Sequence, residues 1–248
     1  MPRTHKSLPR LYVEFALAPA IPVTLGKDQS LYLAAVLRKA VGDEAVLFNG
    51  LDGAWRCRIT SNSKKAVTLE PVELIAPQAP RADLWYGFAP LKTGRLDYLV
   101  QKATEMGAGT IQPVLTQYTQ GKANPDRLLA NAIEAAEQCE VLNVPAIAPE
   151  ISLERLLANW VADHGQRRLI LCDETALSAS PVEAIATLRG QSVGLLVGPE
   201  GGFSDAELAL LRAQPFVFPI SLGPRILRAD TAAVAALALV QAIIGDWR

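Results

Sequence analysis

Short segments of β-branched and aromatic residues, partly alternating with polar ones, occupy the first third of the chain. Turn signals at residues 42–43 and 49–50 separate them, as is typical of short strands. The predicted strands are residues 11–17, 45–48, 55–59 and 66–74. Between the first two, apolar residues recur at helical spacing up to Val41, and Asp28 is the predicted N-cap. The pattern therefore predicts a small barrel or sandwich with one inserted helix.

The periodicity changes after residues 76–83, which contain two prolines and no regular pattern. Beyond this linker, apolar runs of strand length alternate with helical stretches. The predicted strands are 84–89, 111–115, 169–172, 193–197 and 216–220, and the predicted helices are 95–107, 126–140, 181–189, 204–213 and 230–245. Such alternation favours an α/β fold whose parallel sheet is covered on both faces. Ligands of such sheets bind beyond the carboxyl ends of the strands, so the loops after Val197 and Ile220 are the first candidates for chemistry.

The linker divides the 248 residues into two predicted domains, 1–76 and 77–248. With 50% hydrophobic and 20% charged residues, the composition is that of a folded globular protein. No apolar run is long enough to span a membrane, and the first residues do not resemble a signal peptide. The three cysteines form no CxxC pair, so neither a disulfide framework nor a zinc ribbon is predicted. We therefore expect a reduced, cytoplasmic protein.

Charge is unevenly distributed although the net charge is only −1. Residues 1–65 contain ten lysines and arginines and five acidic residues, a net charge of +5, so the remainder carries −6. A nucleic-acid-binding module joined to an acidic domain would show this asymmetry, because phosphate binding depends on local positive potential. An ordinary solvated surface is the alternative.

A glycine-rich turn, Gly-Pro-Glu-Gly-Gly, follows the predicted strand 193–197. Its spacing matches neither the phosphate-binding loop GxxxxGK[ST] nor the dinucleotide-binding motif GxGxxG. Ser204 and Glu207 have the spacing of a capping box for the next helix. A rigid Pro-Glu between glycines lets the backbone approach a flat ligand while one carboxylate faces the pocket. A tight strand-to-helix connection without a ligand is the alternative.

A second Gly-Pro turn follows the predicted strand 216–220 and carries two arginines, Arg225 and Arg228. Asp230 is the predicted N-cap of the alanine-rich helix that comes next. A capping loop with solvent-exposed arginines is the alternative to a functional site. Two rigid Gly-Pro turns at successive strand ends favour the functional interpretation.

A third motif places Gln101, Lys102 and Glu105 on one side of a predicted helix. Glu105 is three positions from Lys102 and four positions from Gln101. The spacing alone therefore favours a surface network between neighbouring side chains of the helix.

Four segments in order along the chain carry a family resemblance: Gln101–Gly107, Ala135–Cys139, Leu196–Gly202 and Leu222–Arg228. Together they closely resemble the RsmE family, the ribosomal RNA small-subunit uridine N3-methyltransferases of the SPOUT class. Residues 33–38, 42–43, 47–50 and 63–65 are similar to the PUA-like RNA-binding domain of that family. The resemblance thus spans nearly the whole chain.

The resemblance implies a PUA-like β-barrel over residues 1–76 and an α/β SPOUT domain over 77–248, whose parallel sheet contains a trefoil knot. It implies that S-adenosylmethionine donates a methyl group to N3 of a specific uridine in 16S ribosomal RNA, on the assembled 30S subunit. It also implies a cytoplasmic homodimer that requires neither a metal ion nor a membrane.

Carried over by position, the resemblance places the cofactor in two loops, with residues 171–174 as a third candidate. The implied cofactor-binding residues are Leu196, Val197, Gly198, Pro199, Glu200, Gly201, Gly202, Ile220, Ser221, Leu222, Gly223, Leu227 and Arg228. The uracil anion that forms when N3 loses its proton needs a nearby cation. Arg228 is the first candidate for this catalytic role and Arg225 the second, while Glu200 and Asp230 are candidates for the general base or an orienting group.

Basic residues are the candidates for holding the RNA, and this grip should weaken as salt concentration rises. They are Arg3, Arg10, Arg38, Lys64, Lys65, Lys102 and Arg225. The chain departs from the family pattern in having no arginine between Cys139 and Pro145, and in having Asp230 where a glutamate is commoner.

Two other functions remain open from the sequence. Related SPOUT enzymes methylate the ribose 2′-hydroxyl, and a non-catalytic RNA-binding assembly factor could keep the fold. A metalloenzyme is disfavoured because His5 and His164 stand alone in the sequence. A serine or cysteine hydrolase is disfavoured because no GxSxG motif is present.

Overall fold

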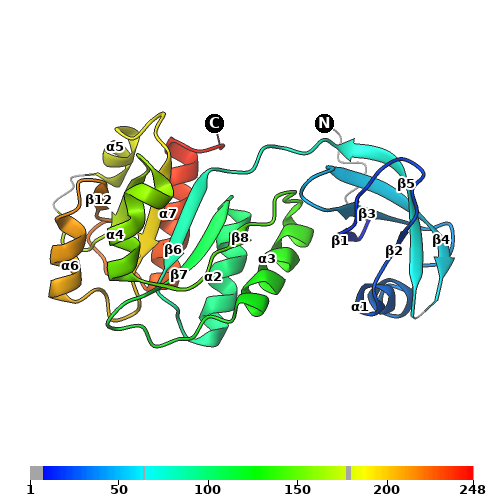
Figure 1. Cartoon of the computed structure of the whole chain (residues 1–248), viewed down its shortest axis with the longest axis horizontal. Coiled ribbons are helices and arrows are strands. Elements are labelled where there is room, and N and C mark those ends of the chain that lie inside the picture. The colour runs from blue at the N-terminus through cyan, green and yellow to red at the C-terminus, as the bar shows by residue number, and fades with distance from the viewer. Residues whose placement is uncertain (1–7, 64, 177–179, 248) are drawn as a thin grey trace. The chain divides into compact units, whose positions relative to one another are not determined.

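The computed structural model describes residues 8–63, 65–176 and 180–247. The chain divides into two compact units (Figure 1). Unit 1 comprises the chain up to Pro80 together with Ala136–Val144, and unit 2 comprises Arg81–Ala135 and the chain from Pro145 onward. The predicted linker, residues 76–83, forms neither helix nor strand except at Ala76, which belongs to a strand of unit 1.

Unit 1 contains one curled sheet of five strands, in the order β1-β3-β4-β5-β2 (Figure 1). The strands are β1 (Arg10–Tyr12), β2 (Val23–Thr24), β3 (Glu44–Phe48), β4 (Ala54–Asn62) and β5 (Val67–Ala76). The β1–β3 pair is parallel and the other pairs are antiparallel. Shifts of register interrupt the long β4–β5 pair at three points, and such irregularities bend a sheet. The predicted β-rich first part is thus confirmed.

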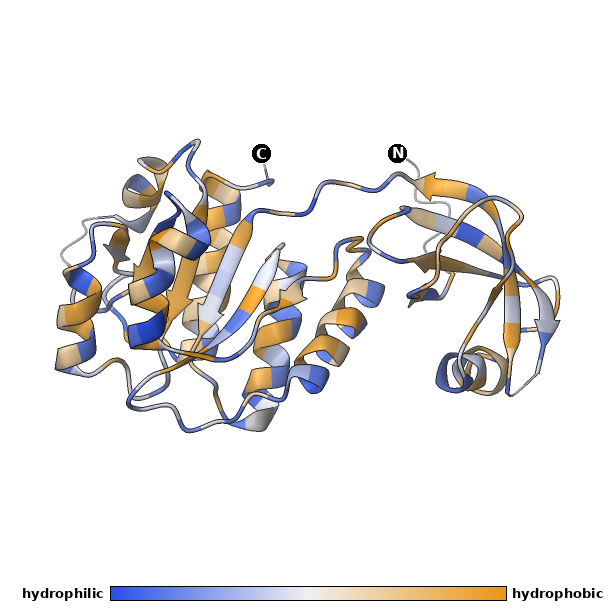
Figure 2. Ribbon diagram, viewed as in Figure 1, coloured by the Kyte–Doolittle hydropathy of each residue, from blue (hydrophilic) through white to orange (hydrophobic). Residues whose placement is uncertain are grey.

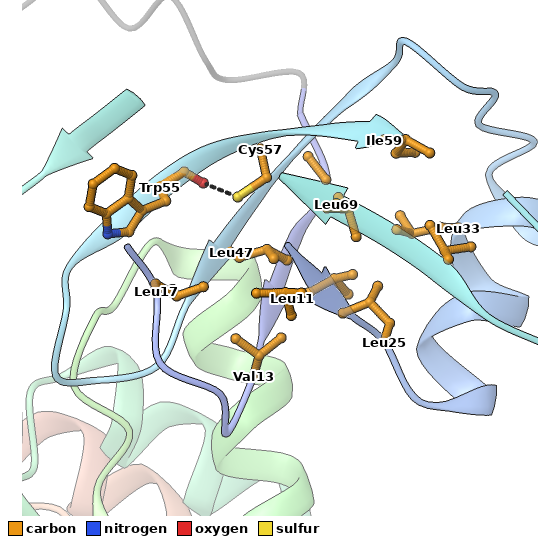
Figure 3. Close-up of a cluster of buried hydrophobic side chains, with 13 residues drawn as sticks. Leu11, Val13, Leu17, Leu25, Leu33, Leu47, Trp55, Cys57, Ile59 and Leu69 are labelled. Atoms are coloured by element: carbon orange, nitrogen blue, oxygen red, sulfur yellow. Dashed lines mark hydrogen bonds between the residues drawn. The ribbon is translucent and has the colours of Figure 1, made fainter. Parts of the chain in front are cut away.

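The inserted helix of unit 1 begins earlier than predicted. Helix α1 (Lys27–Leu31) continues directly into a π-helical turn, η1 (Tyr32–Val36). Its N-cap is Gly26, so the prediction of Asp28 as N-cap is wrong. Leu33 from η1 is buried in the same cluster as Leu47 and Leu69 from the sheet (Figure 3). The helix therefore packs on the inner face of the curled sheet.

Strand β3 is buried on both faces, which explains why its sequence does not alternate. Leu47 faces the cluster of Figure 3, whereas Phe48 belongs to a second cluster with Ala136 and Leu142. The backbone N–H of Tyr12 also donates to the carboxylate of Glu137, at 2.8 Å. These contacts explain why residues 136–144 group with unit 1.

Unit 2 is built on a parallel sheet in the order β12-β10-β11-β6-β7-β8, with the short β9 paired to β7. The strands are β6 (Leu84–Phe88), β7 (Thr110–Leu115), β8 (Ala146–Ile147), β9 (Ile151–Ser152), β10 (Arg168–Cys172), β11 (Val193–Val197) and β12 (Val217–Ile220). Every residue of the central strands β6 and β11 is buried. The predicted α/β fold with a parallel sheet is confirmed.

Amphipathic helices cover both faces of this sheet (Figure 2). They are α2 (Thr93–Glu105), α3 (Pro125–Cys139), α4 (Leu153–His164), α5 (Pro181–Ala186), α6 (Asp205–Arg212) and α7 (Ala229–Ile243). On one face, Trp160 of α4 and Leu211 of α6 pack with Leu196 of β11. Leu195 points to the opposite face, where α7 packs against β11, α2 and α5. No helix among the described residues is long and apolar enough to cross a membrane.

Some predicted boundaries were wrong and some elements were missed. Helix α7 begins at Ala229 with Arg228 as its N-cap, so Asp230 lies in the first turn and does not cap the helix. Strands β2, β8 and β9 and helix α4 were not predicted. The signal for α4 is present in the sequence, because buried residues recur at helical spacing after Ser152, whose side chain accepts a hydrogen bond from the backbone of Arg155.

We predict that Ser30→Ala destabilises unit 1 by about 1 to 3 kcal/mol, because it leaves a buried N–H group without a partner. The Ser30 hydroxyl is fully buried, donates to the carbonyl oxygen of Leu25 at 3.2 Å and accepts from the N–H of Val67 at 2.9 Å. Urea unfolding followed by circular dichroism measures the change. Thr60→Ala is the control, since it removes an exposed hydroxyl bond to Thr68 in the same unit. Equal losses in the two variants would contradict the prediction.

Candidate functional site

One cavity of about 640 Å³ lies in unit 2, where the loops after β10, β11 and β12 meet. These three strands are parallel neighbours, so their carboxyl ends lie at the same edge of the sheet. The backbone N–H of Asp173, just after β10, donates to the carbonyl oxygen of Ile220 at 2.9 Å and keeps two of the loops together. The cavity lies where the strand pattern predicted chemistry.

Most of the candidate cofactor residues line this cavity. They are Val197, Gly198, Pro199, Glu200, Gly201, Gly202, Ser221, Leu222, Gly223, Leu227 and Arg228. Leu196 and Ile220 are fully buried strand residues and do not line it. Cys172, Asp173 and Glu174, from the third candidate segment, also line it. Ile226, which lies within the second candidate loop, lines it too. The lining residues that the sequence did not suggest are Arg95, Thr175, Phe203, Leu208, Ala229 and Ala232.

The glycines after β11 allow a tight turn that packs against two aromatic side chains. Gly202 has a φ of +72°, and its N–H donates to the carbonyl oxygen of Pro199 at 2.9 Å. A Cβ on Gly198 would lie 2.8 Å from the ring of Phe203, and a Cβ on Gly201 would lie 3.2 Å from the Cβ of Tyr118. Glycine at these positions therefore makes room for protein side chains around the loop.

The predicted capping box is present and also fixes a second loop. The backbone N–H of Ser204 donates to Oε2 of Glu207 at 2.8 Å, and the N–H of Glu207 donates to the Ser204 hydroxyl at 3.3 Å. The other carboxylate oxygen of Glu207 accepts from the N–H of Gln117 at 2.7 Å. Because Glu207 is only 5% exposed, these bonds are shielded from water and hold the glycine loop against the segment that carries Tyr118.

A buried acidic network holds the loop after β10. The Asp173 side chain is 1% exposed, and its Oδ2 accepts from Nε and Nη2 of Arg212 at 2.9 and 2.6 Å. Its Oδ1 accepts from the N–H and the hydroxyl of Thr175 at 2.9 and 2.8 Å. Burial alone would raise the pKa of Asp173, but the bonds from Arg212 and Thr175 outweigh it and lower the pKa below 3.8. Asp173 is therefore a structural anion.

Three arginines line the cavity, and only one of them forms an ion pair among the described residues. Arg95, at the start of α2, pairs with Glu200 at 3.3 Å. Arg225 and Arg228 are exposed and form no ion pair with any residue in the described ranges. Both line the cavity, so it has a cationic side.

The candidate acids lie in different places. Glu200 lines the cavity, whereas Asp230 does not, and the Asp230 carboxylate accepts from the N–H of Thr231 at 2.9 Å. Glu174, which the sequence suggested only as part of the third segment, lines the cavity as well.

The candidate RNA-binding residues are distributed over both units. In unit 1, Arg38 and Lys65 are exposed, whereas Arg10 is half-buried with its guanidinium 5.4 Å from the centre of the Phe48 ring. Burial lowers the pKa of Arg10, and the nearby carboxylates of Glu140 and Glu137 partly offset this. Arg3 and Lys64 lie outside the described residues.

Lys102 in unit 2 forms one of the two pairs of the surface network that the spacing favoured, whereas Gln101 donates to Oδ1 of Asn131 at 3.2 Å. The Lys102 ammonium group lies 2.6 Å from the carboxylate of Glu105, one helical turn along α2. Among the described residues, no group of three or more histidine, cysteine, aspartate or glutamate side chains could hold a metal ion. His164 instead packs its ring 4.2 Å from that of Trp160.

Comparison with known proteins gives a consistent result. The RNA methyltransferase domain family matches residues 77–241, and the RNA methyltransferase PUA domain family matches residues 25–72. The Ribosomal RNA small subunit methyltransferase E of Rickettsia conorii is 31% identical over 234 residues, which cover 94% of each chain.

Two solved structures are also similar to this chain. One is the Ribosomal RNA small subunit methyltransferase E of Neisseria gonorrhoeae bound to S-adenosyl methionine, with a TM-score of 0.83, 26% identity and coverage of 97% of this chain and 100% of that one. The other is a Legionella pneumophila protein in complex with the bound cofactor SAM, with a TM-score of 0.80, 29% identity and coverage of 95% and 97%.

We predict that Asp173→Asn destabilises unit 2 by about 1 to 2 kcal/mol at neutral pH, because it removes a charge-assisted pairing with an arginine that is itself partly solvated. The pKa of Asp173 is lowered in the folded state, so its stabilising effect is complete above the unfolded value of 3.8 and is lost as pH falls through the folded pKa. The difference in unfolding free energy between wild type and variant should therefore shrink below pH 3.8.

Urea unfolding at several pH values measures this difference. Glu150→Gln, which neutralises an exposed carboxylate, is the control and should change little at any pH. A gap between wild type and Asp173→Asn that is independent of pH would show that the carboxylate charge is not what stabilises the loop.

Proposed function

This chain belongs to the Ribosomal RNA small subunit methyltransferase E family, and from that premise we propose that it methylates N3 of a uridine in small-subunit ribosomal RNA. Methyl transfer from S-adenosylmethionine to small-subunit ribosomal RNA is the activity of the family; the base and the atom are our inference. The proposal rests chiefly on the cavity. It lies at the carboxyl ends of three parallel strands, and two loops that contain Gly-Pro form part of its lining.

The residues of the cavity fit S-adenosylmethionine. A volume of about 640 Å³ is that of a small-molecule site. Val197, Leu222 and Leu227 supply apolar surface, and the glycine loop supplies backbone N–H and C=O groups for a purine edge. The carboxylates of Glu174 and Glu200 suit the positive charges of the cofactor. When bound, S-adenosylmethionine supplies an activated methyl group.

The enzyme must then orient the uracil and stabilise the anion formed when N3 loses its proton. Negative charge develops on the two carbonyl oxygens beside N3, and a fixed cation there lowers the barrier. Arg228 is our candidate for this role because it lines the cavity without an ion pair among the described residues, and Arg225 is the second. Alignment of donor and acceptor contributes further.

Glu200 is the better placed of the two acids proposed as general base or orienting group. It lines the cavity and is held by Arg95, whereas the side chain of Asp230 lies outside the lining. The pairing with Arg95 fixes the direction of the Glu200 carboxylate, so an orienting role for Glu200 is favoured over proton abstraction.

We also propose the remaining features that the family resemblance implies. Residues 1–76 would hold RNA through Arg10, Arg38 and Lys65, and residues 77–248 would carry the trefoil knot and the catalytic site. The target base would have to leave its stack to enter the cavity. The substrate would be the assembled 30S subunit, the enzyme would act as a homodimer, and its location would be the cytoplasm.

The proposal predicts that the protein transfers labelled methyl groups from S-adenosylmethionine to small ribosomal subunits that lack the modification. Mass spectrometry of the nucleosides should identify N3-methyluridine, and naked ribosomal RNA should be a poorer substrate than the subunit. A ribose-methylated product would overturn the proposed acceptor atom. Failure to bind S-adenosylmethionine and to transfer methyl groups would instead favour a non-catalytic RNA-binding factor.

A pair of variants separates cofactor binding from chemistry. Arg228→Ala should lower kcat by about 100- to 1,000-fold, as expected when one group that stabilises a developing anion is removed, while calorimetry should show nearly unchanged S-adenosylmethionine binding. Gly201→Leu should abolish that binding, because the new side chain would displace Tyr118 and the glycine loop. Arg155→Ala removes an exposed arginine of α4 and is the control. Wild-type turnover by Arg228→Ala would exclude it from the mechanism.

A further inference from the structure

Ile226 is an aliphatic side chain that lines the cavity and yet is 85% exposed. No other large hydrophobic residue in the described ranges is as exposed. It lies in the loop between β12 and α7, after the turn in which Gly223 has a φ of +111°. The other large apolar side chains of the cavity, such as Val197, Leu222 and Leu227, are partly or wholly covered by protein. Ile226 therefore offers apolar surface that the described chain leaves uncovered.

The neighbours of Ile226 along the loop indicate what could cover it. Arg225 precedes it and Arg228 follows two residues later, and both are exposed and line the cavity. Exposed arginines recognise phosphate and carbonyl oxygens through charge-assisted hydrogen bonds. An aliphatic group between two such cations matches a ligand that has flat apolar faces and polar edges. A nucleobase attached to a phosphate backbone has this chemistry.

We propose that Ile226 packs against the face of the target uracil and holds it beside the methyl donor, an inference that rests on the proposed function. A base that has left its stack loses the apolar cover of its neighbours, and enzymes that act on such bases replace it with apolar or aromatic side chains. The Ile226 side chain supplies this cover for one face, while the arginines on either side contact the oxygens of the base and the flanking phosphates. Ile226 is thus a positioning residue for the acceptor.

A subunit interface is a less suitable occupant. An interface needs a contiguous surface of about 800 Å² on each partner. Single exposed aliphatic residues are common on protein surfaces and do not mark such an interface. The exposed residues next to Ile226 in the loop are glycine, proline and arginine, so the apolar surface there is limited to one side chain.

The test compares Ile226→Ala and Ile226→Phe with the wild type in methyl transfer to unmodified small subunits. Ile226→Ala should raise KM for the subunit about ten-fold, because one contact with the base is lost, and Ile226→Phe should restore it, because an aromatic ring covers a base at least as well. Calorimetry should show unchanged S-adenosylmethionine binding, and light scattering should show unchanged mass. Val161→Ala, which truncates an exposed aliphatic residue of α4 away from the cavity, is the matched control.

Three results would overturn the inference while leaving the proposed function intact: an unchanged KM in Ile226→Ala, weaker S-adenosylmethionine binding, or a change in oligomeric mass. If the wild type transfers no methyl group, the proposed function fails. The inference about Ile226 is then tested by filter binding of small subunits to the wild type and to Ile226→Ala in the presence of S-adenosylhomocysteine. Weaker binding by Ile226→Ala would then still support contact with RNA. Equal binding by the two proteins, or no binding by the wild type, would overturn the inference as well.

Discussion

Helix α6 connects two of the three loops that form the cavity, and the shape of the site depends on this connection. At its N-terminus, the buried carboxylate of Glu207 holds Ser204 of the glycine loop and the backbone of Gln117. At its C-terminus, Arg212 donates two hydrogen bonds to the buried Asp173 in the loop after β10. Separating the loops would expose or leave unpaired a buried carboxylate at each end, which is costly. Helix α6 therefore holds these two loops in place at the carboxyl edge of the sheet.

The same arrangement determines which charges remain available for chemistry. Arg212 neutralises Asp173, and Arg95 pairs with Glu200, whereas Arg225 and Arg228 have no such partner among the described residues. Two arginines that line the cavity without an ion pair among the described residues favour ligands with negative or developing negative charge. This matches an RNA phosphate and a uracil anion. Two ion pairs, and two arginines without such a partner in the described ranges, thus give the loops of a parallel sheet the charges that our proposed methyl transfer requires.

The sequence predicted those features that depend on local pattern. Apolar runs separated by helical stretches were enough for the parallel sheet, and the spacing of Ser204 and Glu207 was enough for the capping box. The pairings of Arg212 with Asp173 and of Arg95 with Glu200 were not predictable, because the partners are 39 and 105 residues apart. The N-caps assigned to Asp28 and Asp230 were wrong because an acidic residue in the first turn of a helix gives the same sequence signal as a cap.

Hydrogen–deuterium exchange with and without S-adenosylhomocysteine tests most directly whether this cavity is the cofactor site. The backbone amides that should be protected on binding lie in residues 173–175, 198–203, 221–223 and 225–228, which line the cavity. Our account predicts that the amides of all three loops exchange more slowly when S-adenosylhomocysteine is bound, because one ligand contacts all three loops. Binding with protection confined to other parts of the chain would contradict it.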